Sequence, residues 1–345
     1  MLKGGMYHVF KENNLSCADC LRSPIFRSLR RKSGTAGSGG PGAYVMDADT
    51  GDELYAKQPD LRGYPGSTTK MMTCIVALEN GQGIMDKTIR ITDKALSVEN
   101  DASVLGLQQG DQITLRNALT GMMLVSGCDA AVAIAETVEP TEDAFVAKMN
   151  AKAAAIGATH THFVNPHGLP DANHYSTARD LAKIGAYGMK LPAFRDIVKR
   201  STFDMPYVDG SYKHCVSTNE FLTSGFPGAN GIKTGTTNAG GPCLVVSATQ
   251  NGRTVIAAIM NSEDRYGDAQ ALMKYGFSVL KPLENVYIIR KAPAGQTLTE
   301  LGRQQMEQAK AAADAKAKGQ AAQETAYGTD ADTADMAAAA VKKSA

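Results

Sequence analysis

The chain has 345 residues, of which 43% are hydrophobic and 21% charged, so it is long enough for one large or two medium globular domains. Its 36 basic and 35 acidic residues give a net charge of +1, which excludes the broad positive field typical of proteins that bind nucleic acids or anionic membranes. No stretch approaches the roughly 18 to 20 consecutive apolar residues that span a bilayer, and we therefore expect no transmembrane segment.

Residues 1–41 predict a basic, disordered arm that ends in a Gly/Ser-rich linker. A secretory signal carries an apolar core of about 7 to 15 residues, and the arm has no such core. Its Cys17-x-x-Cys20 pair lacks a second ligand pair at zinc spacing, so we expect two free thiols and no metal. The six scattered cysteines suggest no disulfide framework and favour a reduced environment.

Residues 42–282 carry the patterned body of the chain. Two alternating strands around an Asp-Thr-Gly turn are predicted over 43–60, a fully buried helix over 69–79, and a second helical stretch over 115–137 that Ser126-Gly127 interrupts. Residues 228–262 predict three successive strands joined by Gly/Asn-rich turns. Residues 283–345 predict a short strand at 286–289 and then an Ala-rich tail that cannot bury a core.

The stretch "YPGSTTKMM", residues 64–72, places Ser67 and Lys70 three positions apart at the start of the predicted buried helix. Three residues are about one helical turn, so both side chains project from one face, and backbone N–H groups at the helix start can face an oxyanion. For Lys70 to accept a proton near neutral pH, its pKa must fall by about three units. Taken alone, the pattern also fits a capped helix start with a surface lysine, and Ser278-x-x-Lys281 matches it as well.

A second cation that would lower this pKa is offered by "GIKTGTT", residues 231–237, on a predicted strand. There Gly235 would allow a ligand backbone to approach the strand closely. The alternatives to a functional role are that Lys233 is a solvated charge on an edge strand and that Ser126 only bends its helix.

In this order and context, Ser67-x-x-Lys70, Ser126-Gly-Cys128 and Lys233-Thr-Gly235 resemble the three motifs of the penicillin-recognising serine enzymes. Within that group the chain is similar to the D-alanyl-D-alanine carboxypeptidases, the low-molecular-mass penicillin-binding proteins, over about residues 42–280. The resemblance implies an α/β fold of the β-lactamase and DD-peptidase type. Such a fold has a five-stranded antiparallel sheet with helices on both faces and a helical subdomain.

The resemblance further implies removal of the terminal D-alanine from peptidoglycan stem peptides, without metal or organic cofactor, and acylation by β-lactam antibiotics. Its implied catalytic residues are Ser67 as nucleophile, Lys70 as base and Ser126 as proton relay. Six residues are implied to bind the substrate, with the backbone N–H groups of Ser67 and Thr236 forming the oxyanion hole: Cys128, Lys233, Thr234, Gly235, Thr236 and Arg265. The expected location is the cell envelope, although the first 40 residues show no signal peptide.

One position departs from the family's pattern, because Cys128 stands where the family usually carries Asn. A thiol is a weaker hydrogen-bonding group than a carboxamide, which keeps open a non-catalytic, wall-binding homologue. The other alternative is a serine β-lactamase, although residues 159–175 contain no Glu of the kind that serves deacylation in one large class. Ser217-Thr-Asn219 and the histidines at 160, 162, 167 and 174 are interpreted as structural.

Overall fold

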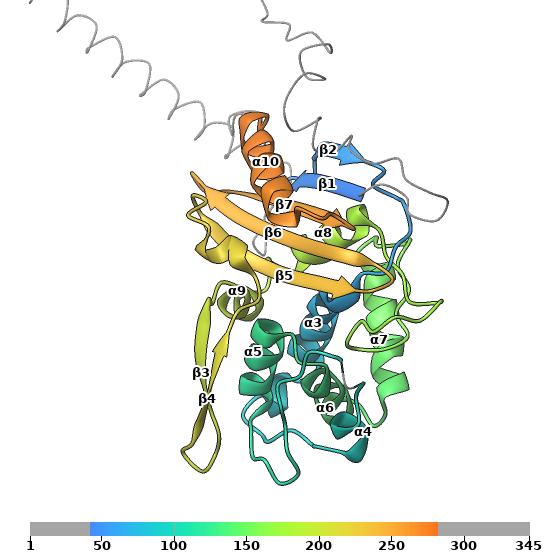
Figure 1. Cartoon of the computed structure of the whole chain (residues 1–345), viewed down its shortest axis with the longest axis vertical. Helices are drawn as coiled ribbons and strands as arrows, with labels where there is room; N and C mark the ends of the chain where they lie inside the picture. The colour runs from blue at the N-terminus through green and yellow to red at the C-terminus, as the bar shows by residue number, and fades with distance from the viewer. Residues whose placement is uncertain (1–41, 100, 282–345) are drawn as a thin grey trace, which may run out of the picture. The chain divides into compact units, whose positions relative to one another are not determined.

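The computed structural model describes residues 42–99 and 101–281 (Figure 1). The predicted basic arm, the predicted strand at 286–289 and the Ala-rich tail lie outside the described residues, and the bounds of the domain stay a prediction. None of the helices in the described ranges is long and apolar enough to cross a membrane.

The predicted five-stranded antiparallel sheet is confirmed, in the order β2-β1-β7-β6-β5. Its strands come from the two ends of the described chain: β1 (Gly42–Asp47), β2 (Glu53–Lys57), β5 (Ala229–Thr237), β6 (Gly241–Gln250) and β7 (Arg253–Met260). The turn between β6 and β7 uses Asn251 and Gly252, both at positive φ, as the two-residue hairpin signal requires. The hairpin predicted over 43–60 corresponds to β1 and β2.

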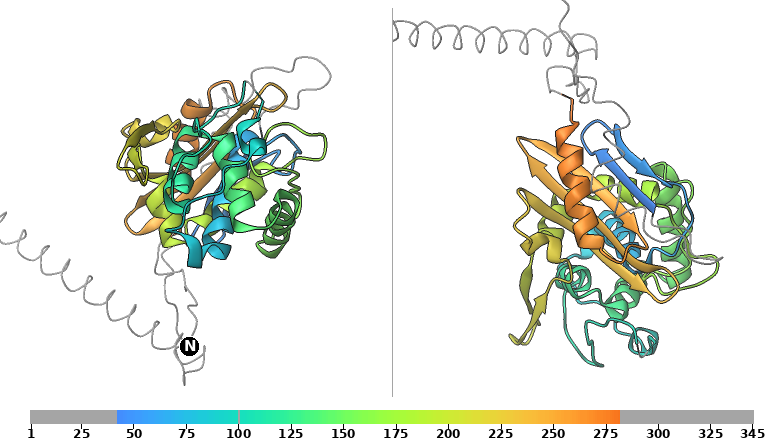
Figure 2. Two further views of the ribbon diagram at one scale, coloured as in Figure 1. Left: turned by 90° about the horizontal axis from the view of Figure 1, so that it is seen from below. Right: turned by 45° about the horizontal axis from the view of Figure 1, so that its top comes forward.

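Helices cover both faces of the sheet, and the alternation of side chains along each strand explains why both faces are apolar. In β1, Tyr44 and Met46 join the core beneath α8 (Ala178–Gly188). Ala43 and Val45 join the core beneath α10 (Arg265–Ser278), which lies across the opposite face (Figure 2). Strand β1, which lies between β2 and β7, is therefore buried along its whole length.

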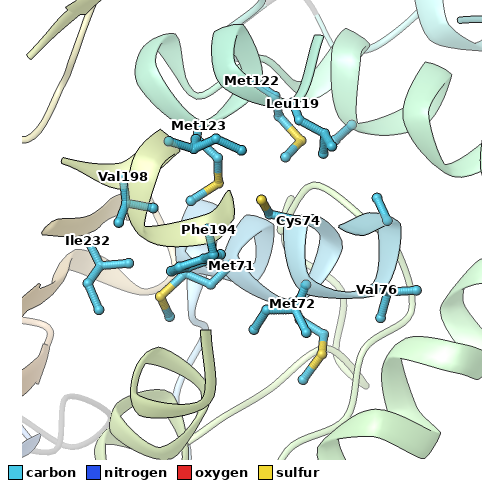
Figure 3. Close-up of a cluster of buried hydrophobic side chains, with 14 of the residues drawn as sticks. Met71, Met72, Cys74, Val76, Leu119, Met122, Met123, Phe194, Val198 and Ile232 are labelled. Atoms are coloured by element: carbon cyan, nitrogen blue, oxygen red, sulfur yellow. The ribbon is translucent and has the colours of Figure 1, made fainter. Parts of the chain in front are cut away.

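A helical layer extends from the α8 face of the sheet (Figure 1). It is built from α3 (Lys70–Asn80), α4 (Asp93–Leu96), α5 (Leu115–Val125), α6 (Cys128–Val138), α7 (Glu142–Ala155) and α9 (Pro192–Val198), with the single 3₁₀ turns η1 (Gly66–Thr69) and η2 (Gln82–Ile84). The predicted buried helix is α3, and Figure 3 shows its methionines packed among side chains of α5, α9 and β5. The break predicted at Ser126-Gly127 separates α5 from α6.

A small hairpin, β3 (Thr202–Pro206) paired with β4 (Tyr212–Val216), stands beside α5, and the 3₁₀ turn η3 (Glu220–Thr223) follows it. The sequence analysis did not predict this hairpin. The sequence signals for this hairpin were the Asp209-Gly210 turn and a short run of alternating apolar residues on each side of it.

Candidate active site

The start of α3 brings Ser67 and Lys70 into contact. Gly66, at φ +55°, turns the chain into η1, and this single 3₁₀ turn leads directly into α3. Lys70 Nζ donates a hydrogen bond to Ser67 Oγ at 2.9 Å. Ser67 is partly exposed whereas Lys70 is fully buried, so one side of the pair is open to a ligand and the other is closed to water.

Lys70 Nζ has two further partners, the backbone oxygen of His167 at 2.8 Å and the thiol of Cys128 at 3.3 Å. Burial lowers the pKa of Lys70, and the neighbouring Cys128 and Asp129 oppose this shift. A lowered pKa favours the neutral amine, which is the form of a lysine that can accept a proton. The alternative of a surface lysine at a capped helix start is wrong.

The α5–α6 junction places Ser126 and Cys128 at the edge of this site. Ser126 ends α5 in the left-handed conformation, at φ 65°, and Cys128 begins α6. The Cys128 N–H donates to the oxygen of Ser103 at 2.7 Å, and the Cys128 side chain is only 2% exposed. Within the described part of the chain, no hydrogen bond joins the Ser126 hydroxyl to Ser67, Lys70 or Lys233.

Asp129 holds this junction in place through four backbone N–H groups. Its Oδ1 accepts from Leu105 at 2.6 Å and Ala130 at 2.8 Å, and its Oδ2 accepts from Gly106 at 2.7 Å and Leu107 at 2.9 Å. A carboxylate saturated in this way ties the loop before α5 to the first turn of α6.

Strand β5 contributes the second group of predicted residues. Lys233 is 1% exposed, so the alternative of a solvated edge-strand charge is wrong. Its Nζ donates to the oxygen of Thr234 at 3.0 Å. Burial, with the charge of Lys70 as the next cause, holds the pKa of Lys233 well below its usual range. The Thr234 hydroxyl lies 2.6 Å from that of Thr218.

Gly235 is where β5 meets η1. A Cβ atom on Gly235 would lie 2.6 Å from the oxygen of Pro65 and 3.1 Å from the nitrogen of Ser67. The close approach that glycine permits is therefore made by the protein's own backbone beside Ser67, where the sequence analysis had expected a ligand backbone.

Arg265, the first residue of α10, lies against the end of β5. Its Nη1 donates to Thr236 Oγ1 at 2.9 Å, to the oxygen of Gly235 at 3.2 Å and to the oxygen of Cys243 at 3.3 Å. Two groups of predicted residues are thus in direct contact: Ser67 and Cys128 each bond to Lys70, and Arg265 bonds to Gly235 and Thr236. Among the described residues, no side-chain hydrogen bond joins Ser126, Lys233 or Thr234 to either group.

Two of the four histidines interpreted as structural, His167 and His174, lie beside Lys70 and its neighbour Thr69. His174 Nδ1 accepts from the Val164 N–H at 3.2 Å, so its Nε2 carries the proton and donates to Thr69 Oγ1 at 2.8 Å. Burial lowers the pKa of His167 to about 3 and that of His174 to about 4. Among the residues that the structure describes, no group of three or more His, Cys, Asp or Glu side chains is arranged to hold a metal ion.

The sequence analysis did not predict three contacts of the candidate site. They are the bond of the His167 oxygen to Lys70, the four backbone bonds to Asp129 (the Asp129 clamp), and the contact of Thr218 with Thr234. The first and last join residues far apart in sequence and have no local signal. Asp129 follows Cys128 directly, and an acidic residue in the first turn of a helix was a readable sign of a capping role.

Comparison with known proteins gives a consistent result. The family model described as D-alanyl-D-alanine carboxypeptidase matches residues 38–264. The chain is 38% identical over 255 residues to the D-alanyl-D-alanine carboxypeptidase of Streptomyces sp. (strain K15), covering 69% of this chain and 87% of that protein. It is 34% identical to D-alanyl-D-alanine carboxypeptidase DacF of Bacillus subtilis, covering 68% of this chain and 61% of the relative.

The crystal structure of the Streptomyces K15 DD-transpeptidase superposes with a TM-score of 0.64 at 37% identity, covering 72% of this chain and all of that one. Solved variants of that enzyme replace a serine and, two positions later, a cysteine. A Ser-x-Cys spacing like that of Ser126 and Cys128 is thus present in a solved relative.

Proposed function

Because this chain belongs to the D-alanyl-D-alanine carboxypeptidase family, we propose that it removes the terminal D-alanine from peptidoglycan stem peptides through an acyl-enzyme on Ser67. The observation that carries the proposal is the 2.9 Å contact between Ser67 Oγ and the fully buried Lys70 Nζ. A nucleophile in hydrogen-bond contact with a base that other groups orient is the general signature of covalent catalysis.

In the acylation step, the Ser67 hydroxyl proton passes to Lys70 Nζ while Ser67 Oγ bonds to the carbonyl carbon between the two D-alanines. The backbone N–H groups of Ser67 and Thr236 stabilise the oxyanion. The proximity of these two groups is supported by Gly66 and Gly235, since a Cβ on Gly66 would lie 3.2 Å from the Thr236 nitrogen. The peptide C–N bond then breaks, and the proton that Lys70 took from Ser67 passes through the Ser126 hydroxyl to the departing D-alanine nitrogen, so that Lys70 is neutral again.

In the deacylation step, water attacks the ester carbon, passes a proton toward Lys70, and the shortened peptide leaves as Ser67 regains its hydroxyl proton. Lys70 Nζ contacts the His167 oxygen and the Cys128 thiol. These two contacts hold the amine in the same place during acylation and deacylation, which supports a role for Lys70 in both steps.

The terminal carboxylate of the substrate is assigned to Thr234, Lys233 and Arg265. Lys233 has a pKa well below its usual range because burial disfavours its charge, and an anion bound beside it would favour the protonated form.

The family acts on the cell wall, so we place the site of action outside the cytoplasmic membrane, where stem peptides are exposed. β-Lactam antibiotics would acylate Ser67 by the same chemistry, and no metal or organic cofactor takes part in the proposed steps.

Intact-mass spectrometry with a penicillin, together with release of D-alanine from a blocked tripeptide ending in D-Ala-D-Ala, tests the proposal. We expect the wild type to form a persistent adduct and to release D-alanine, and Ser67→Ala to do neither. The matched control is Ser278→Ala, because Ser278 belongs to the chain's second Ser-x-x-Lys pattern and should leave both readouts unchanged.

Two outcomes would reject the proposal in favour of its rivals. Rapid loss of the penicillin without a persistent adduct would identify a β-lactamase. An adduct without any release of D-alanine would identify a homologue that kept the cleft and lost turnover.

A further inference from the structure

The segment Ser217-Thr218-Asn219, between β4 and η3, has no role in the proposed steps, yet it contacts three elements that carry site residues. The Thr218 N–H donates to the oxygen of Leu124, in the last turn of α5, at 3.0 Å. The Tyr266 hydroxyl of α10 donates to the Thr218 oxygen at 2.9 Å. The Thr218 side chain meets that of Thr234 on β5.

The two threonine hydroxyls differ in their surroundings. Thr234 is 5% exposed, whereas Thr218 is exposed. The Thr234 hydroxyl oxygen, Oγ1, lies 2.6 Å from Thr218 Oγ1. A pair of hydroxyls has two protons, and one is used in the bond between them. When Thr218 donates, its proton occupies one lone pair of the Thr234 hydroxyl oxygen, so the Thr234 proton points away from Thr218 and is left for an acceptor.

We propose that Thr218 is a positioning residue for substrate recognition, whose hydroxyl orients that of Thr234 toward the terminal carboxylate of the stem peptide. This inference rests on the proposed function and adds a determinant of specificity to it. Because a carboxylate accepts hydrogen bonds and an ester offers no negative charge to the same donors, the hydroxyl pair favours substrates with a free C-terminus.

The backbone contacts of Thr218 explain why it can act in this way although its side chain is exposed. Its N–H and its oxygen are both bonded to helices of the domain, so the residue is held at a fixed distance from β5. An exposed threonine on an unanchored loop would lose that geometry through backbone motion.

The test compares acylation of Ser67 by benzylpenicillin, which carries a carboxylate, with acylation by its methyl ester, both followed by intact-mass spectrometry. Thr218→Val keeps the β-branched shape and removes the hydroxyl, whereas Thr218→Ser keeps the hydroxyl. Thr223→Val is the matched control, because Thr223 is an exposed threonine in η3 whose hydroxyl bonds only to the oxygen of Glu220.

We expect Thr218→Val to slow acylation by the acid about three- to tenfold, the effect of one hydrogen bond, and to change the ester rate less than about twofold. Thr218→Ser and Thr223→Val should keep the wild-type ratio of acid to ester rates. An equal loss for acid and ester in Thr218→Val, or no loss for either, would overturn the inference while leaving the proposed function standing. Failure of the wild type to form any adduct would instead reject the proposed function, and this inference with it.

Discussion

The Sγ atom of Cys128 lies 3.3 Å from Nζ of Lys70, and both side chains are almost wholly buried. The thiol therefore occupies the place beside the base where the family's pattern usually has an asparagine amide. It accepts an N–H of the lysine well enough to hold it, but it offers a bound peptide group only a weak donor.

We therefore expect Cys128→Asn to raise the rate of acylation by a D-Ala-D-Ala peptide about tenfold, because a carboxamide can bond both Lys70 and the substrate. The rate is measured as release of D-alanine at saturating and at subsaturating concentrations of the peptide. Cys215→Ala, which alters a buried cysteine on β4, is the control and should leave the rate unchanged. A rate that stays level or falls in Cys128→Asn would mean that this site is adapted to the thiol.

The pH dependence of acylation should report Lys70. Ser67 is activated only when Lys70 is neutral, so kcat/KM rises with pH up to the pKa of Lys70 and then levels. Burial lowers the pKa of Lys70 below the ordinary lysine range, and Cys128 opposes this shift. The rising, acid limb of the profile should therefore lie below that range. His167 and His174, with pKa values of about 3 and about 4, are neutral throughout the range above pH 5.

Removing the opposing contribution of Cys128 should therefore move the acid limb of the profile to lower pH in Cys128→Ala, which leaves no side-chain acceptor at position 128 beside Lys70. The profile is measured as the rate of penicillin adduct formation between pH 5 and pH 10. A limb that shifts upward, or one that is unchanged by the substitution, would show that the titrating group is not Lys70.

The strands of the sheet and the buried helix that follows Ser67 were predictable from local signals, whereas the assembly of five strands into one antiparallel sheet was implied by the family resemblance. The apolar strand β1, the Asn-Gly turn before β7 and the all-apolar α3 each follow from short stretches of sequence. The hairpin β3–β4 was missed because only one residue of each strand is fully buried, Met205 in β3 and Cys215 in β4, which leaves little apolar alternation to detect.

The residues of the candidate site could be proposed from the sequence, but most of their contacts could not. Three motifs in one order identified Ser67, Lys70 and Lys233, but no local pattern reveals that the oxygen of His167 reaches Lys70 across 97 positions. The reason for Gly235 was likewise misjudged, because only the packing of η1 against β5 shows that the protein's own Pro65 fills the space.

Gly235→Ala tests that packing. Its Cβ would meet the backbone of Pro65 at 2.6 Å and of Thr68 at 3.0 Å, and neither can give way without moving Ser67. We expect penicillin acylation to fall at least about 100-fold and stability to fall by about 1 to 3 kcal/mol. Gly83→Ala, with no atom within 4 Å of the added methyl, is the matched control. Wild-type acylation by Gly235→Ala would contradict the contact between η1 and β5.

Asp129→Asn tests whether the clamp on the α5–α6 junction supports the site. The change keeps the shape but turns one acceptor oxygen into an NH₂ group, which then faces the N–H groups bonded to that oxygen. Leaving buried donors unsatisfied costs about 3 kcal/mol, or about 8 °C in Tm for a domain of this size. Scanning calorimetry measures this loss.

The same substitution should reduce penicillin acylation more than tenfold at a temperature where the variant is still folded. Freed residues 103–107 no longer support Cys128, whose N–H bonds to Ser103. Asp86→Asn is the control, because the Asp86 side chain is 83% exposed and its ion pair within the described residues is with Arg116 at the surface. A variant that loses stability yet acylates at the wild-type rate would confine Asp129 to a structural role, because the position of Cys128 would then not depend on the loop.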